Sequence, residues 1–107
     1  MVSQRIVKKN LIAYLKKLKA KIVVDRAYLI GSWAKNQAKK DSDVDLLILS
    51  HAFSNLDQDE RLRILYRQTA GIDFDLHIHA VTPEELKNAS RLTSLGAMEK
   101  DKKVALI

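Results

Sequence analysis

The spacing of apolar residues along the chain predicts two amphipathic helices. From about Ser3 to Lys21 the apolar side chains recur at 3.6-residue intervals, which predicts a helix with one core-facing stripe: Val7, Leu11, Tyr14, Leu15 and Leu18. A second pattern from Asp57 to Ala70 puts Leu62, Leu65, Tyr66 and Thr69 on one side. Asp57, with Glu60 three residues later, has the pattern of a capping box and marks where this helix begins.

Three segments between and after these helices have the patterns of β-strands. Residues 26–30 are typical of a short buried strand that ends at Gly31-Ser32. Residues 44–49 are apolar nearly throughout, as expected for a central strand covered on both faces. Residues 72–81 alternate strictly, which predicts a third strand. One of its faces is apolar (Ile72, Phe74, Leu76, Ile78, Ala80) and the other polar (Asp73, Asp75, His77, His79).

The remaining segments complete an α/β pattern. Residues 33–40 are polar and predict one or two helical turns. Thr82-Pro83-Glu84-Glu85 is a helix start, with threonine as N-cap and proline at the first helical position, and this helix is expected to reach about Ser90. Residues 91–107 are weakly patterned, as a last helix or a loose tail. The order α-β-α-β-α-β-α predicts a three-stranded mixed sheet flanked by helices, in one domain over 1–107 with a core over about 3–90.

Composition narrows the class of protein. A chain of 107 residues fits one domain, and a hydrophobic fraction of 47% is enough for one core. Cysteine is absent, which excludes disulfides, thiolate metal sites and a cysteine nucleophile. No apolar run approaches the ~20 residues that cross a bilayer, and the basic amphipathic N-terminus lacks the apolar stretch of a signal peptide. A cytoplasmic protein without a membrane partner is expected.

Charge is distributed unevenly around a net value of +6. The first 21 residues hold no acid and seven bases: Arg5, Lys8, Lys9, Lys16, Lys17, Lys19 and Lys21. Such a basic face attracts nucleotides, nucleic acid or an acidic partner, or is simply a solvated helix surface. Five of the thirteen acids are gathered in two short segments, as Asp41, Asp43, Asp45, Asp73 and Asp75.

Two short motifs carry candidate chemistry. Gly31-Ser32 follows a predicted strand and precedes a helical segment, where glycine allows close approach of a ligand and the following N–H groups favour phosphate; alone, such a pair is most often a turn. Asp43 and Asp45 open the central strand, and residues two apart on a strand share a face. Two adjacent carboxylates are costly without a cation, and oxygen-only ligation favours Mg²⁺ or Mn²⁺. A capped turn over 41–43 is the structural alternative.

The two motifs together resemble the signature of a known superfamily. Gly31-Ser32, ten intervening residues and Asp43-Val44-Asp45-Leu46 are similar to the motif of the nucleotidyltransferases that include DNA polymerase β, and most of all to their minimal branch, the small MNT proteins. The helix–strand order also matches, so the resemblance covers most of the chain. The family usually has glycine four residues after the serine, where this chain has Asn36. Asparagine tolerates a left-handed conformation, so we expect the turn to survive.

The resemblance implies a metal-dependent reaction with ATP. Asp43 and Asp45 would hold two Mg²⁺ ions, and a third carboxylate on a later strand would complete the site. Asp75 is the preferred candidate for that role, with Asp73 as the alternative one pleat away.

The same resemblance assigns residues to the phosphates. Gly31 and Ser32 would hold the β- and γ-phosphates of the nucleotide. Lys35, Lys39 and Lys40 are placed to neutralise the triphosphate, although a solvated loop is the more ordinary interpretation.

Three neighbouring side chains have less certain roles in this scheme. His77 and His79 share a face with the two candidate third carboxylates. A His-x-His strand pair beside carboxylates can bind a transition metal, but such histidines more often only border the site. Trp33 is placed to stack on a base, although packing against a helix is the more common role.

Partners and competing functions also follow from the resemblance. Many MNT proteins are encoded beside a HEPN-domain ribonuclease and act as its antitoxin, some by adding AMP to a tyrosine of that partner. We therefore expect an adenylyltransferase that forms an oligomer or hetero-oligomer with such a toxin. The alternative is a non-catalytic binding module, either a stoichiometric inhibitor or a nucleic-acid binder, suggested by the basic first helix and Asn36. Transfer to a small molecule ranks third, because relatives that do this generally carry a further C-terminal domain.

Overall fold

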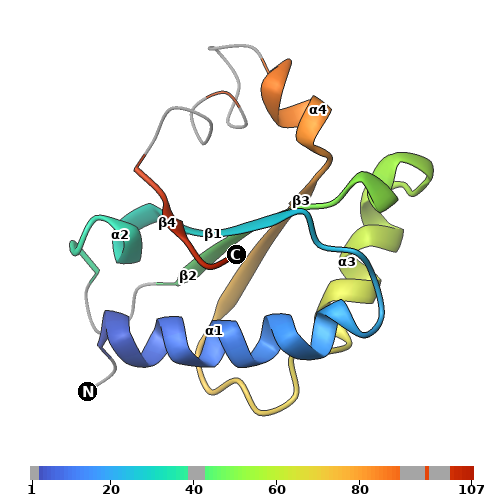
Figure 1. The fold of residues 1–107 in the computed structure, drawn as a ribbon. Coiled ribbons are helices and arrows are strands. Elements are labelled where there is room, and N and C mark those ends of the chain that lie inside the picture. Colours follow the sequence, from blue (N-terminus) through green and yellow to red (C-terminus); the bar gives the residue numbers. More distant parts are fainter. Residues whose placement is uncertain (1–2, 39–42, 90–95, 97–101) are drawn as a thin grey trace.

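A mixed sheet of four strands organises the fold. The computed structural model describes residues 3–38, 43–89, 96 and 102–107. The strands lie in the order β3-β2-β1-β4 (Figure 1), with β1 at Arg26–Ile30, β2 at Val44–Leu49, β3 at Leu76–Val81 and β4 at Val104–Ala105. β1 is antiparallel to β2 and β4, whereas β2 and β3 are parallel. The predicted mixed α/β architecture is confirmed.

The strand count is four, where the sequence predicted three. β4 has two residues and pairs with Tyr28 and Leu29 of β1. A strand of two residues is too short to show an alternation of polar and apolar side chains. Most of the weakly patterned segment 91–107 lies outside the described residues.

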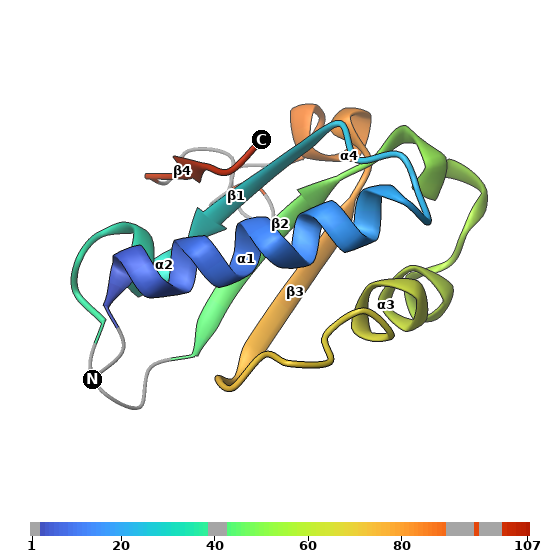
Figure 2. The same ribbon diagram turned by 60° about the horizontal axis from the view of Figure 1, so that its bottom comes forward.

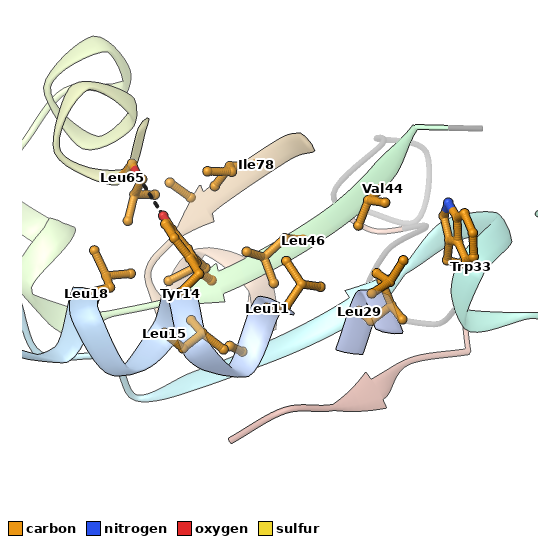
Figure 3. Packing of buried hydrophobic residues seen from close by; sticks show 14 of the residues in the cluster. Leu11, Tyr14, Leu15, Leu18, Leu29, Trp33, Val44, Leu46, Leu65 and Ile78 are labelled. Atoms are coloured by element: carbon orange, nitrogen blue, oxygen red, sulfur yellow. Dashed lines mark hydrogen bonds between the residues drawn. The ribbon is translucent and has the colours of Figure 1, made fainter. Parts of the chain in front are cut away.

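Helix α1 (Gln4–Lys19) covers one face of the sheet, as Figure 2 shows. Ser3 caps it by accepting a hydrogen bond from the N–H of Ile6. Its buried residues are the predicted stripe, and they pack on the inward side chains of the strands, among them Leu29, Leu46 and Ile78 (Figure 3). The hydroxyl of Tyr14 donates to the carbonyl of Leu65 at 2.6 Å, and burial raises the pKa of Tyr14.

Helix α3 (Gln58–Tyr66) is joined to α1 by the Tyr14–Leu65 hydrogen bond and begins at the predicted capping box of Asp57 and Glu60. It is shorter than the predicted helix over 57–70, and its buried residues are Leu65 and Arg61. The predicted buried face was wrong at Tyr66, which is 39% exposed. Arginine was not a candidate for the core, because charged side chains are rarely buried unless they are paired.

The opposite face of the sheet is divided into two parts. Toward one end, Leu86 of α4 (Pro83–Lys87) packs on Leu47, Leu49 and Ile30. The other end carries Asp45 of β2, which shares this face with Leu47 and Leu49 by strand alternation. Figure 1 shows α1 and α4 on opposite sides of the sheet. Among the described residues, this end of the face carries the polar side chains of Asp45 and His77, next to Ile30 at the border of the apolar cluster.

Several predicted boundaries shift by a few residues. The helical segment expected over 33–40 is α2 at Gly31–Ala34, so it begins at the glycine itself. The strand expected over 72–81 begins at Leu76, and α4 begins at the predicted Thr82 cap but ends at Lys87 instead of Ser90. A 3₁₀ helix (His51–Asn55) follows β2. Within the described ranges, no helix has the length and apolar content needed to cross a membrane.

Arg61 ties α3 to α4 through a network of hydrogen bonds. Its guanidinium donates to the carbonyls of Leu56 and Ala80 and to Glu85, the last at 2.7 Å, and lies 5.6 Å from the ring centroid of Phe53. These contacts satisfy a charge that would be costly to bury alone. The hydrogen bond from Arg61 is the largest cause that holds the pKa of Glu85 below its ordinary value.

This pair predicts a pH dependence of stability. A carboxylate whose pKa is lowered by folding stabilises the fold above its unfolded pKa, and that contribution is lost as the pH falls through the folded value. Glu85→Gln should therefore lower the free energy of unfolding at pH 7, and the difference from the wild type should shrink below the ordinary pKa of about 4.5. Denaturant melts between pH 3 and 7 measure this.

Glu84→Gln is the matched control, because it removes the same charge from α4 and leaves the Arg61–Glu85 pair in place. Equal effects of the two substitutions at every pH would contradict a role for the pair.

Candidate functional site

The site is built on the turn where β1 runs directly into α2. Ile30 is extended, and Gly31 then adopts a φ of +73°, in the left-handed region that side-chain-bearing residues rarely enter. A Cβ at this position would lie 2.6 Å from Oδ2 of Asp45. The Asp45 carboxylate therefore packs against the bare α-carbon of Gly31, and both features of this position require glycine.

Asp45 lies between two strands that approach it from opposite sides. In the sheet it pairs with Ile30 of β1 and with His77 of β3. Its Oδ1 lies 3.3 Å from Nε2 of His79 and 3.4 Å from Nδ1 of His77. Its side chain is 28% exposed, so the carboxylate is partly desolvated but open to a ligand.

The other candidate carboxylates stand at the edge of the same site. Asp43 precedes β2 and is exposed, and Asp75 immediately precedes β3 and is also exposed. The N–H of Val44 donates to the backbone carbonyl of Asp75 at 2.9 Å, which holds the two segments together where the parallel strands begin. Asp73 is exposed two residues earlier, before the strand. Asp75 is therefore the nearer of the two to β3.

The group of side chains whose geometry could hold a metal ion differs from the three-aspartate set that was expected. Within the described ranges, the His and acidic side chains whose ligand atoms all lie within 4.8 Å of one another are Asp45, His77 and His79. Asp43 and Asp75 are not part of that group. The parallel register explains this, because it sets His77 and not an aspartate beside Asp45. Sequence alternation placed both histidines on this face but could not supply the register.

The remaining predicted residues lie around the Gly31 turn. Ser32 is the second residue of α2, and Trp33 is 9% exposed and packs in the main core, as the more common role predicted. Lys35 follows α2 and is exposed. Asn36 has a φ of +57°, so the expected left-handed turn is present without glycine. Lys39, Lys40 and Asp41 lie outside the described residues.

Comparison with known protein families decides what kind of domain this is. The family model described as a nucleotidyltransferase domain matches residues 8–105. The chain belongs to the nucleotidyltransferase domain family. The matched range contains every candidate site residue from Gly31 to His79. None of the curated proteins matches the chain.

Solved structures share the fold of this nucleotidyltransferase domain. A protein from Sulfolobus solfataricus, provisionally named a nucleotidyltransferase, aligns with a TM-score of 0.71 at 16% identity, over 95% of this chain and 80% of its own. A toxin–antitoxin structure with AMP-PNP aligns with a TM-score of 0.62 at 20% identity, over 90% of this chain and 72% of its own. At these identities the likeness establishes the shared fold.

The Gly31–Asp45 contact of this nucleotidyltransferase domain predicts unequal costs for two glycine substitutions. Gly31→Ala forces a Cβ onto the Asp45 carboxylate in addition to the left-handed backbone strain. We expect the strain to cost about 1–2 kcal/mol and the collision a further ~1–3 kcal/mol. The free energy of unfolding from denaturant melts measures the sum.

Gly71→Ala is the control, because Gly71 has a φ of +92° and no atom within 4 Å of an added Cβ. It should show the strain alone. Equal losses of stability at the two positions would show that the Asp45 contact contributes nothing.

Proposed function

We propose that this nucleotidyltransferase domain transfers AMP from ATP to a hydroxyl group of a protein partner. The observation that carries the proposal is the Asp45 carboxylate packed on the left-handed turn at Gly31. In a domain of this family, this contact would bring a phosphate-binding backbone next to a metal ligand. Two residues 14 positions apart in sequence are thereby joined at one point.

A divalent metal fits the acidic end of this site. Asp45 and Asp43 would hold Mg²⁺, as two ions in the full site, with Asp75 as the third carboxylate and Asp73 as the alternative. Three exposed or half-exposed carboxylates near the start of β2 and β3 leave room for water and phosphate oxygens, which Mg²⁺ retains. The metal would neutralise charge on the transferring phosphoryl group.

The protein's own groups would bind and orient the nucleotide. The backbone N–H groups at the Gly31–Ser32 turn would hold the phosphates, and the Ser32 hydroxyl would add a donor. Lys35 lies just after α2 and would place positive charge near the triphosphate. Asp75 would receive the proton of the acceptor hydroxyl.

A protein acceptor suits a site this open. Asp43, Asp75 and His77 are all exposed, so a side chain of a partner protein could reach them. A structural neighbour is a toxin–antitoxin complex with AMP-PNP, which supports a toxin as partner. We propose that the chain is a single MNT-type domain over residues 1–107, that its partner is a HEPN-domain toxin, and that modification of the toxin makes the chain its antitoxin.

The test is transfer of label from α-labelled ATP in the presence of Mg²⁺ and a HEPN-domain toxin. Asp43→Asn with Asp45→Asn should abolish labelling and leave the fold intact, because relief of carboxylate repulsion offsets lost contacts. Asp75→Asn should lower the rate about 100-fold or more but keep much of the nucleotide binding. Asp73→Asn should be close to the wild type.

Each alternative outcome has a distinct meaning. An inactive Asp73→Asn beside an active Asp75→Asn would move the third carboxylate one pleat along. Labelling that survives in the folded double mutant would overturn the metal assignment. Inhibition of the toxin without any labelling would favour a non-catalytic binding module.

A further inference from the structure

The polar face of the sheet carries a group of side chains whose chemistry differs from that of the three aspartates. His77 and His79 project from one strand, and Asp45 projects from the parallel neighbour. Two imidazoles and one carboxylate are ligands that zinc and related transition metals accept, whereas Mg²⁺ prefers oxygen alone. We propose that Asp45, His77 and His79 bind one divalent transition metal of the zinc class.

Two of the three distances within this group match those around a single bound ion. Two ligand atoms at 2.0–2.1 Å from a tetrahedral zinc lie about 3.3–3.4 Å apart. Oδ1 of Asp45 lies 3.3 Å from His79 Nε2 and 3.4 Å from His77 Nδ1. These separations are long for hydrogen bonds that share one acceptor and equal two edges of such a tetrahedron. The ligand atoms of the two histidines lie within 4.8 Å of each other and their ring centroids are 4.5 Å apart, so binding would draw the two rings closer by side-chain rotation.

The three side chains of the Asp45–His77–His79 group differ in solvent exposure and therefore in how freely they can move. The side chain of His79 is 20% exposed and that of Asp45 is 28% exposed, so the sheet and the Gly31 turn restrain them. His77 is 63% exposed and can turn toward the ion. Three protein ligands leave at least one position open to water or a substrate oxygen, which is the arrangement of a reactive metal site rather than a structural one.

Asp45 belongs to this set and to the proposed Mg²⁺ site. Its two oxygens face different neighbours, since Oδ1 lies beside the histidines and Oδ2 beside Gly31. An ion on Oδ1 would therefore lie next to the nucleotide site without using the Asp43 and Asp75 carboxylates. Binding of this metal requires only Asp45, His77 and His79, so it can be tested whether or not the chain transfers AMP.

The experiment is a calorimetric titration of the untagged chain with Zn²⁺, repeated with Co²⁺ while its visible absorption is recorded. We expect one ion per chain and a Co²⁺ spectrum of nitrogen and oxygen ligation. His77→Ala, His79→Ala and Asp45→Asn should each weaken binding about tenfold or more. Mg²⁺ in large excess should fail to displace Co²⁺ from the wild type, because nitrogen ligands favour the transition metal.

His51→Ala is the matched control. His51 also contacts a carboxylate, with Nδ1 2.9 Å from Oδ2 of Asp25, but this pair lies at the opposite end of β1 and β2. It should bind Zn²⁺ like the wild type. Because His77 is largely exposed, His77→Ala should fold, and circular dichroism checks this. A wild type that binds Zn²⁺ no better than His77→Ala, or a His51→Ala that loses the ion, would overturn the proposal.

Discussion

The contact between the Asp45 carboxylate and the bare α-carbon of Gly31 is the constraint on which the site depends. It needs a backbone conformation that only glycine adopts readily and a space that any Cβ would fill. It joins the end of β1 to the start of β2, so the antiparallel pairing of these strands places it. The fold thus places the Gly31 turn, which we propose binds phosphate, next to the Asp45 carboxylate, which we propose binds metal.

The rest of the fold keeps this contact in register. β2 is buried along nearly its whole length, with Val44, Leu46 and Ile48 against α1 on one face and Leu47 and Leu49 beneath α4 on the other. A one-residue slip of such a strand would exchange its two faces and carry Asp45 into the core, which the cost of burying a charge forbids. The apolar packing of β2 therefore fixes the face of the sheet on which the Asp45 carboxylate lies.

The sequence was informative where a local pattern determines the structure. The 3.6-residue stripe of α1, the capping box at Asp57, the N-cap at Thr82 and the doubly covered β2 are local signals, and each is present as predicted. The left-handed Asn36 was also foreseen, because the turn requires it and asparagine tolerates it. The family could be recognised from the combined Gly-Ser and Asp-x-Asp motif. The two parts occur together because the Asp45 carboxylate packs on Gly31.

What could not be predicted depends on contacts between distant segments. β4 is two residues long and exists only by pairing with β1, and Arg61 is buried only because Glu85 and two carbonyls reach it from other elements. The alternation of residues 72–81 put two aspartates and two histidines on one face. Only the parallel register of β2 and β3 shows that the histidines, and not the aspartates, lie beside Asp45.

The position of a bound metal ion is the most direct test of the proposed site at Gly31 and Asp45. A crystal of the chain grown with AMP-PNP and Mn²⁺ would show the ion by its anomalous scattering. We predict a peak about 2.0–2.6 Å from a carboxylate oxygen of Asp45, next to the Gly31 turn and with phosphate oxygens on its other side. A peak away from Asp45, with the nucleotide bound elsewhere than at Gly31 and Ser32, would contradict it.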